Sequence, residues 1–130
     1  MKKRETKLVN FSKALQRLKE AIALFEQNSE NDVVRDGVIQ RFEFTYELAW
    51  KAAKEYIEYE GIVGKNYPRA VIKEAFALQL ITDEDNWITM INDRNMTSHI
   101  YKEEMAEEIA QRIVEIYTRE FELLLQRLMK

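Results

Sequence analysis

Cysteine is absent from this sequence, and histidine and proline each occur only once. The absence of cysteine excludes a disulfide framework, a thiol nucleophile and the usual zinc sites, and it is typical of a reducing compartment. A single histidine, His99, also argues against a metal site built from several histidines of one chain. We therefore expect no metal ion and no other cofactor.

Long hydrophobic runs and an excess of positive charge are missing as well. No apolar run approaches the roughly 18 residues of a membrane-spanning helix, and residues 1–5 lead into an amphipathic helix, not into the apolar core of a signal peptide. We expect a soluble, cytoplasmic protein with no membrane partner. The net charge of −3 argues against nonspecific coating of nucleic acid, so any contact with RNA has to be local and basic.

Glycine occurs only three times, so the chain has few turn signals for a protein of many strands. Apolar residues instead recur at spacings of three and four, the period of amphipathic helices. The pattern predicts five helices. Four of them span residues 4–27, 33–60, 68–80 and 102–129, and the remaining one begins at a cap in residues 82–85 and ends at 97–98. We predict a single all-α domain over residues 1–130, an up-and-down bundle with two short helices crossing between the long ones.

The predicted helix over residues 33–60 is apolar on more than one side, so it needs more than one neighbour. We predict that it is the central helix and that its surplus apolar surface faces a second subunit in a homodimer. Gly61 is placed to end this helix as the first residue beyond its cap. Gly37, near the start, either allows close packing or is fortuitous.

Two groups of apolar residues are expected inside the protein. In the short helix over residues 68–80, the residues expected to face inward are Val71, Ile72, Ala75, Phe76 and Leu80. The aromatic cluster of the second helix recurs at helical spacing, which favours core and interface over a platform for stacking bases. Its members are Phe42, Phe44, Tyr46 and Trp50.

The chemistry-bearing side chains gather in residues 93–102. A histidine has an ordinary pKa near neutrality and an arginine is a permanent planar donor, so Arg94 and His99 suit acid–base chemistry on a phosphoryl group. On one continuous helix, residues five apart lie about 140° from each other and would not meet a common ligand. Thr97 and Ser98 are poor helix-interior residues, so we predict that the helix ends there and brings His99 beside Arg94.

The segment 94–101 resembles the arginine–x4–histidine–x–tyrosine motif of the HEPN superfamily, in particular of its HepT-like nucleotidyltransferase substrate-binding branch. The three motif positions are Arg94, His99 and Tyr101. Three further segments carry the resemblance: residues 41–51, Pro68–Arg69 with residues 74–76, and Trp87 ahead of residues 93–95. The resemblance implies an all-α homodimer that pairs with a minimal nucleotidyltransferase encoded nearby. It also marks Tyr101 as the acceptor of AMP from that partner.

Two main functions remain open at this point. The first is a metal-independent endoribonuclease toxin of a toxin–antitoxin pair, inhibited when its partner AMPylates a tyrosine. Cleaving RNA without a metal needs a base, an acid and a cation, so Arg94 would stabilise phosphate charge and His99 would act as base or acid. One protomer has one histidine, so a two-fold dimer would supply both roles. The alternative is a non-catalytic substrate- or nucleotide-binding subunit of a two-component nucleotidyltransferase, and a third is a purely structural dimer.

Three residues near the pair have a structural interpretation beside the functional one. Asp93 and Asn95 would support the site, but Asp93 pairing with a neighbouring arginine and Asn95 capping a helix end are the favoured interpretations. Tyr101 would be a half-buried phenol with a satisfied hydroxyl if the resemblance did not mark it.

Overall fold

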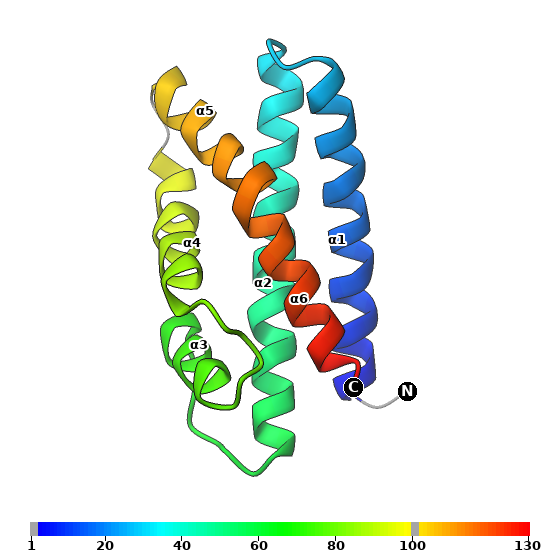
Figure 1. The fold of residues 1–130 in the computed structure, drawn as a ribbon, viewed down its shortest axis with the longest axis vertical. Coiled ribbons are helices and arrows are strands. Elements are labelled where there is room, and N and C mark those ends of the chain that lie inside the picture. The colour runs from blue at the N-terminus through cyan, green and yellow to red at the C-terminus, as the bar shows by residue number, and fades with distance from the viewer. Residues whose placement is uncertain (1–2, 100–101) are drawn as a thin grey trace.

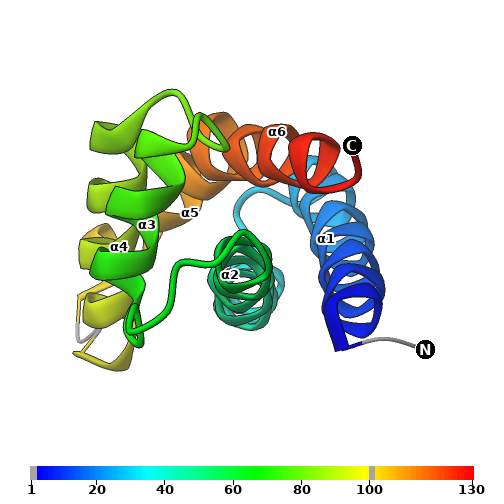
Figure 2. The ribbon, with the colours of Figure 1, turned by 90° about the horizontal axis from the view of Figure 1, so that it is seen from below.

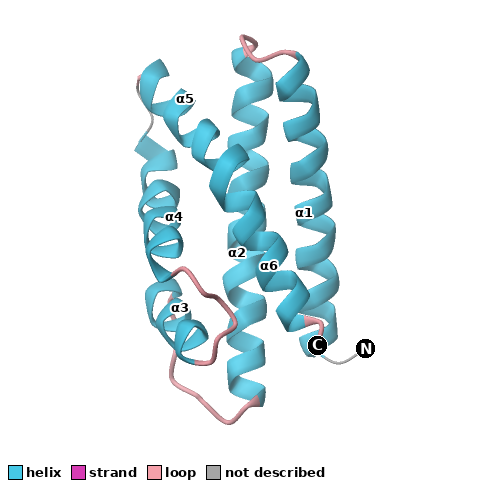
Figure 3. Cartoon of the chain, in the orientation of Figure 1, coloured by secondary structure: helices cyan, strands magenta, loops and turns pink. Residues whose placement is uncertain are grey.

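The computed structural model describes residues 3–99 and 102–130, and these residues form helices and no strand (Figure 3). The elements are α1 (Lys3–Gln27), α2 (Asp32–Tyr59), α3 (Pro68–Ala77), α4 (Glu84–Met96), the 3₁₀ turn η1 (Thr97–His99), α5 (Glu103–Arg112), the π-helical segment η2 (Ile113–Tyr117) and α6 (Thr118–Leu128). Because α5, η2 and α6 follow one another without a gap, they form one long helix. The predicted all-α class with five helices is confirmed for the described part of the chain.

Helix α2 is the central helix, as the sequence predicts. Helix α1 packs along one side of it, α3 and α4 lie on the opposite side, and α5 and α6 cover a third side (Figure 2). The last helix crosses obliquely over the antiparallel pair α1 and α2 (Figure 1). No helix of the described residues is both long enough and apolar enough to cross a membrane.

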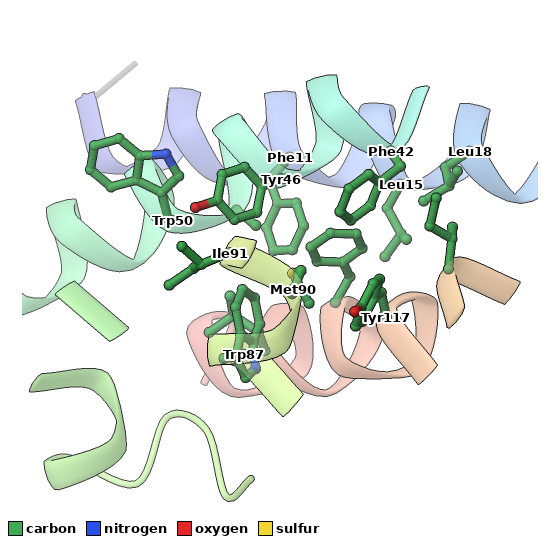
Figure 4. Close-up of a cluster of buried hydrophobic side chains, with 14 of the residues drawn as sticks. Phe11, Leu15, Leu18, Phe42, Tyr46, Trp50, Trp87, Met90, Ile91 and Tyr117 are labelled. Atoms are coloured by element: carbon green, nitrogen blue, oxygen red, sulfur yellow. The ribbon is translucent and has the colours of Figure 1, made fainter. Parts of the chain in front are cut away.

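Aromatic rings form the centre of the core, between α1, α2, α4 and the last helix (Figure 4). Phe121 meets Phe11, Phe42 and Trp87 with ring centroids 6.1, 6.0 and 5.8 Å away. Phe42 also stacks on Tyr117 at 5.6 Å. Edge-to-face and offset arrangements at these distances are the favoured geometries of aromatic pairs. The core therefore joins the first, second, fourth and last helices through a single group of rings.

The aromatic cluster predicted for α2 is divided by the structure. Phe42, Tyr46 and Trp50 are buried, which confirms them as core residues. Phe44 is 61% exposed and so does not belong to the core. Its place at an interface stays a prediction, because the structure holds one chain.

The prediction for the third helix is wrong in two respects. Helix α3 ends at Ala77, and Phe76 is 43% exposed, so it does not face inward. Gln79 adopts a left-handed backbone with φ of 62°, and Leu80 N–H donates to Ala75 O at 2.8 Å. This closing turn directs Leu80 back into the core, where it is buried. The sequence does not signal this turn, because glutamine and not glycine occupies the left-handed position.

The end of α2 and the start of α4 follow the predicted signals, and a side-chain cap also sets the start of α2. Gly61 has φ of 94°, and the N–H of Ile62 donates to Ile57 O at 3.0 Å, which is the six-to-one bond of a Schellman cap. Asn31 accepts from the first backbone amides of α2, and Asp83 accepts from the Asn86 amide at 2.9 Å. Local capping chemistry therefore sets these boundaries.

Gly37 and Gly61 offer a pair of alanine substitutions with opposite expected effects. A Cβ at Gly37 would meet nothing within 4 Å, so the close-packing interpretation is wrong and Gly37→Ala should stabilise the helix by about 1 kcal/mol. Gly61→Ala places a Cβ on a left-handed backbone and should destabilise the protein by about 1 kcal/mol. Urea unfolding followed by circular dichroism measures both, and a shift in the same direction for the two variants would contradict this account.

Candidate functional site

The end of α4 has the predicted break. The α-helix stops at Met96 and tightens into the 3₁₀ turn at Thr97–His99. Thr97 Oγ1 lies 2.7 Å from Arg94 O, and Ser98 Oγ lies 3.4 Å from Asn95 O. Hydroxyls that bond to carbonyls of the preceding turn compete with regular helix bonds, which explains why the helix ends here.

Arg94 lies against two carboxylates of α2. Its Nη1 is 3.1 Å from Glu43 Oε2, and its Nε is 4.0 Å from Glu47 Oε1. Nη1 also donates to Thr97 Oγ1 at 3.1 Å. The Nε atom is buried and has no hydrogen-bond partner among the described residues. The guanidinium is thus anchored on one side by Glu43 while 28% of the side chain remains exposed.

Thr97 connects Arg94 to Glu43. Its hydroxyl lies 2.8 Å from Glu43 Oε2 and has one proton, so it donates either to this carboxylate or to the Arg94 carbonyl. The sequence alone did not predict Glu43, Glu47 and Thr97 as members of the site. Two carboxylates spaced i,i+4 on an otherwise apolar side of α2 are the signal that points to them.

His99 is exposed at the end of η1, and none of the hydrogen bonds or ion pairs within residues 3–99 and 102–130 joins it to Arg94. The expected approach of His99 to Arg94 therefore stays a prediction. Tyr101 lies outside the described residues.

Asp93 has a structural role. It is buried and accepts two hydrogen bonds from Arg112, from Nε at 2.6 Å and from Nη2 at 2.9 Å. The Tyr117 hydroxyl also donates to Asp93 Oδ2. The hydrogen bond to Asp93 raises the pKa of Arg112, and burial together with the same carboxylate raises the pKa of Tyr117. The pairing of Asp93 with an arginine is confirmed, and that arginine comes from the last helix.

The π-helical segment explains why Arg112 and Tyr117 reach the same carboxylate. In a regular α-helix, side chains five residues apart lie about 140° from each other. In η2 the Thr118 N–H bonds to the carbonyl of Ile113, five residues back, which widens the turn. The Thr118 hydroxyl donates to the same carbonyl at 2.8 Å. Residues five apart then come closer to one side of the helix, so the segment aims both donors at α4.

Asn95 is exposed, and its side chain makes no hydrogen bond within the described ranges. The cap that the sequence suggested for it is not seen there. Among the same residues, no group of three or more histidine, cysteine, aspartate or glutamate side chains comes together to hold a metal ion.

A surface groove of about 950 Å³ lies away from these residues, between the start of α1, the end of α2 and the end of α6. Its lining mixes both signs of charge with apolar side chains such as Leu8, Tyr59 and Met129. No residue of the Arg94 site lines it. The concentration of ionisable and hydroxyl groups therefore identifies the end of α4 as the candidate site, although this groove lies elsewhere.

The buried network gives a stability prediction for the two residues that flank Arg94. Asp93→Asn replaces a charged acceptor by a neutral one and should lower the free energy of unfolding by about 2 kcal/mol, since hydrogen bonds to a charged group are the strong ones. Asn95→Ala, at an exposed position, should stay within about 0.5 kcal/mol of the wild type. Urea titrations compare the two, and similar losses for both would refute the structural role of Asp93.

Known proteins resemble this chain over most of its length. The family model described as "Nucleotidyltransferase substrate binding protein like" matches residues 6–130. A curated relative from Haemophilus influenzae, named probable ribonuclease HepT, is 35% identical over 79 residues. That alignment covers 58% of this chain and 54% of the relative, so the match spans about half the length of the curated protein.

Solved structures share the whole fold. A Haemophilus influenzae structure, described as a substrate binding domain of a nucleotidyltransferase, has a TM-score of 0.86 and 27% identity over 95% of this chain and 99% of its own. A tri-AMPylated Shewanella oneidensis HEPN toxin, solved in complex with its MNT antitoxin, has a TM-score of 0.79 and 19% identity over 99% of this chain and 98% of its own. The latter likeness shows the fold alone. Because the family model covers nearly all of the sequence, this chain belongs to the nucleotidyltransferase substrate binding protein-like family.

Proposed function

We propose that this protein is a metal-independent endoribonuclease, the toxin of a pair whose antitoxin is a nucleotidyltransferase. The observation that carries the proposal is Arg94, a partly exposed cation at a helix end, followed five residues later by the exposed His99. A family relative named a probable ribonuclease supports the same activity. Arginine and histidine supply a phosphate-binding cation and a proton-transfer group that works near neutral pH.

Cleavage would proceed by attack of the 2′-hydroxyl of RNA on the adjacent phosphate. Arg94 would stabilise the negative charge that develops on the phosphorane, and His99 would transfer a proton as base or acid. The products would carry 2′,3′-cyclic phosphate or 3′-phosphate ends.

The protein is also proposed to act as a homodimer. Exposed apolar side chains lie on α2 and at the end of α4, among them Phe44 at 61% and Met96 at 40% exposure. A standard interface of about 800 Å² per subunit would cover them. A two-fold axis near the end of α4 would bring two copies of Arg94 and His99 to one cleft, giving that cleft two cations and two histidines.

A second candidate function is a non-catalytic subunit that binds a nucleotide or presents a substrate to the nucleotidyltransferase. The Haemophilus influenzae structure described as a substrate binding domain favours it. In that case the cation of Arg94 would bind phosphate without any proton transfer, and His99 would not be needed.

Cleavage in the presence of EDTA separates the two functions. The purified protein should cut RNA with EDTA present, and His99→Ala should lower the rate by about 10²-fold or more, since general acid–base catalysis typically contributes that much. Cutting is measured by electrophoresis of an end-labelled RNA, and size-exclusion chromatography reports the oligomeric state of the same sample. Thr89→Ala, at an exposed position on α4, is the matched control and should cut normally.

A His99→Ala protein that is folded and cuts RNA as fast as wild type would rule out the catalytic role. Expression of the chain alone in growing cells gives a second comparison. Growth arrest by the wild type and not by His99→Ala is expected for the toxin, whereas equal growth of both would favour the binding subunit.

We further propose that Tyr101 accepts AMP from the nucleotidyltransferase. A nucleotide attached to a phenol two residues beyond His99 would place bulk and a negative phosphate beside Arg94, where RNA must bind. The Shewanella oneidensis toxin of the same fold is itself AMPylated. One covalent event would then block the site without unfolding the protein.

Tyr101→Phe tests this modification. Incubation with partner, ATP and Mg²⁺ should add AMP units to the wild type and none to Tyr101→Phe, as measured by intact mass spectrometry. The variant should keep at least part of the nuclease activity and escape neutralisation by the partner. Modification of another residue while Tyr101 stays unmodified would contradict the assignment.

A further inference from the structure

Glu43 of α2 is the nearest charged neighbour of Arg94, with Oε2 3.1 Å from Nη1. We propose that Glu43 is a further catalytic residue of this site, the general base that takes the proton of the RNA 2′-hydroxyl. This inference rests on the proposed ribonuclease function. It gives His99 the single role of the acid, so each protomer would contain a base, a cation and an acid.

The carboxylate is anchored through one oxygen only. Oε2 lies within hydrogen-bond distance of both Arg94 Nη1 and the Thr97 hydroxyl, at 3.1 and 2.8 Å. Oε1 accepts no hydrogen bond from any residue within 3–99 and 102–130, and the side chain is 31% exposed. One oxygen therefore fixes the group, while the other can meet a substrate hydroxyl, which is the geometry a general base needs.

The charge arrangement favours a chemical role over pure phosphate binding. A carboxylate beside a guanidinium reduces the attraction of that guanidinium for a phosphate and repels the phosphate directly. A site that only binds phosphate is weakened by such a neighbour. A general base, in contrast, needs this position. With Arg94 on a phosphate oxygen, the Glu43 carboxylate would face the 2′-hydroxyl next to that phosphate and remove its proton.

The proposed step balances in bonds and protons. Glu43 Oε1 accepts the proton of the 2′-hydroxyl, and the 2′-oxygen forms a bond to phosphorus. The bond between phosphorus and the 5′-oxygen breaks, and imidazolium His99 gives its proton to that oxygen. The products are a 2′,3′-cyclic phosphate and a 5′-hydroxyl, and both side chains regain their starting protonation by exchange with water.

Glu47 provides a matched comparison one helical turn further along α2. It accepts a hydrogen bond from Trp50 Nε1 at 3.2 Å, lies 3.8 Å from Lys51 Nζ and is 4.0 Å from Arg94 Nε. Its Oε2 is thus directed to Trp50 and Lys51, while its Oε1 faces Arg94 Nε at a longer distance than Glu43 does. The charged groups that bear on Glu43 are Arg94 from α4 and Glu47 from α2 itself, and removing the Glu47 charge tests the general electrostatic effect without removing the base.

The test is the pH dependence of kcat/KM for cleavage of a single-stranded RNA oligonucleotide in EDTA, with the full-length protein between pH 5 and 9. Wild-type kcat/KM should fall towards the alkaline end of this range, because the proposed acid is a histidine and the ordinary pKa of histidine is about 6.5. Glu43→Gln should be about 10²-fold slower or more at pH 7, and its rate relative to wild type should rise about tenfold per pH unit as hydroxide replaces the missing base. Glu47→Gln removes a charge beside Arg94 but not the base, so any change in its rate should be the same at every pH. Thr89→Ala, away from the site, should keep the wild-type rate.

The other possible results distinguish a general base from a residue that only positions Arg94. A Glu43→Gln profile parallel to the wild type, lowered by a constant factor or not at all, would show that Glu43 only positions Arg94 and would overturn the inference. Glu43→Asp keeps the carboxylate, so it should be slower but retain the pH profile of the wild type, and it replaces Glu43→Gln in the test if that variant fails to fold. A wild type that cuts no RNA would refute the ribonuclease proposal and the base with it, whereas cutting with a parallel variant profile refutes the base alone.

Discussion

The buried carboxylate of Asp93 is the constraint on which the candidate site depends. It is held by Arg112 and Tyr117 of the last helix, 19 and 24 residues away in sequence. Successive residues of an α-helix point about 100° apart. While Asp93 fixes one side of α4 to the last helix, Arg94 is therefore directed away from it, to Glu43 of α2. The position of Arg94 and of the turn that carries His99 therefore depends on a buried carboxylate one residue earlier in α4.

The central helix α2 contributes both to the hydrophobic core and to the candidate site. Its buried rings, such as Phe42 and Tyr46, pack the core, and its neighbouring acidic positions Glu43 and Glu47 face Arg94. A partly exposed ion pair of this kind contributes little to stability, since the charges remain partly solvated. In the proposed mechanism the two charges act instead on a substrate phosphate and its neighbouring hydroxyl.

Fold and family do not by themselves distinguish a nuclease from a binding subunit. The same architecture is described for a substrate binding domain and for a toxin that is AMPylated. A function resides in the groups at the site, so the distinction depends on proton transfer by particular residues. An arginine alone suits both functions, whereas proton transfer by a carboxylate and a histidine is needed only for the nuclease.

The sequence by itself determined the helices, because apolar periodicity, the caps at Asn31 and Asp83, and Gly61 are local signals. It also determined the break after Arg94, since hydroxyl side chains compete with helix bonds at that point. Only the tertiary structure decided that Phe76 is exposed, that a π-helical segment aims Arg112 and Tyr117 at Asp93, and that Glu43 meets Arg94. These features depend on which helices pack together. Contacts between residues far apart in the chain produce no periodic pattern that one sequence would show.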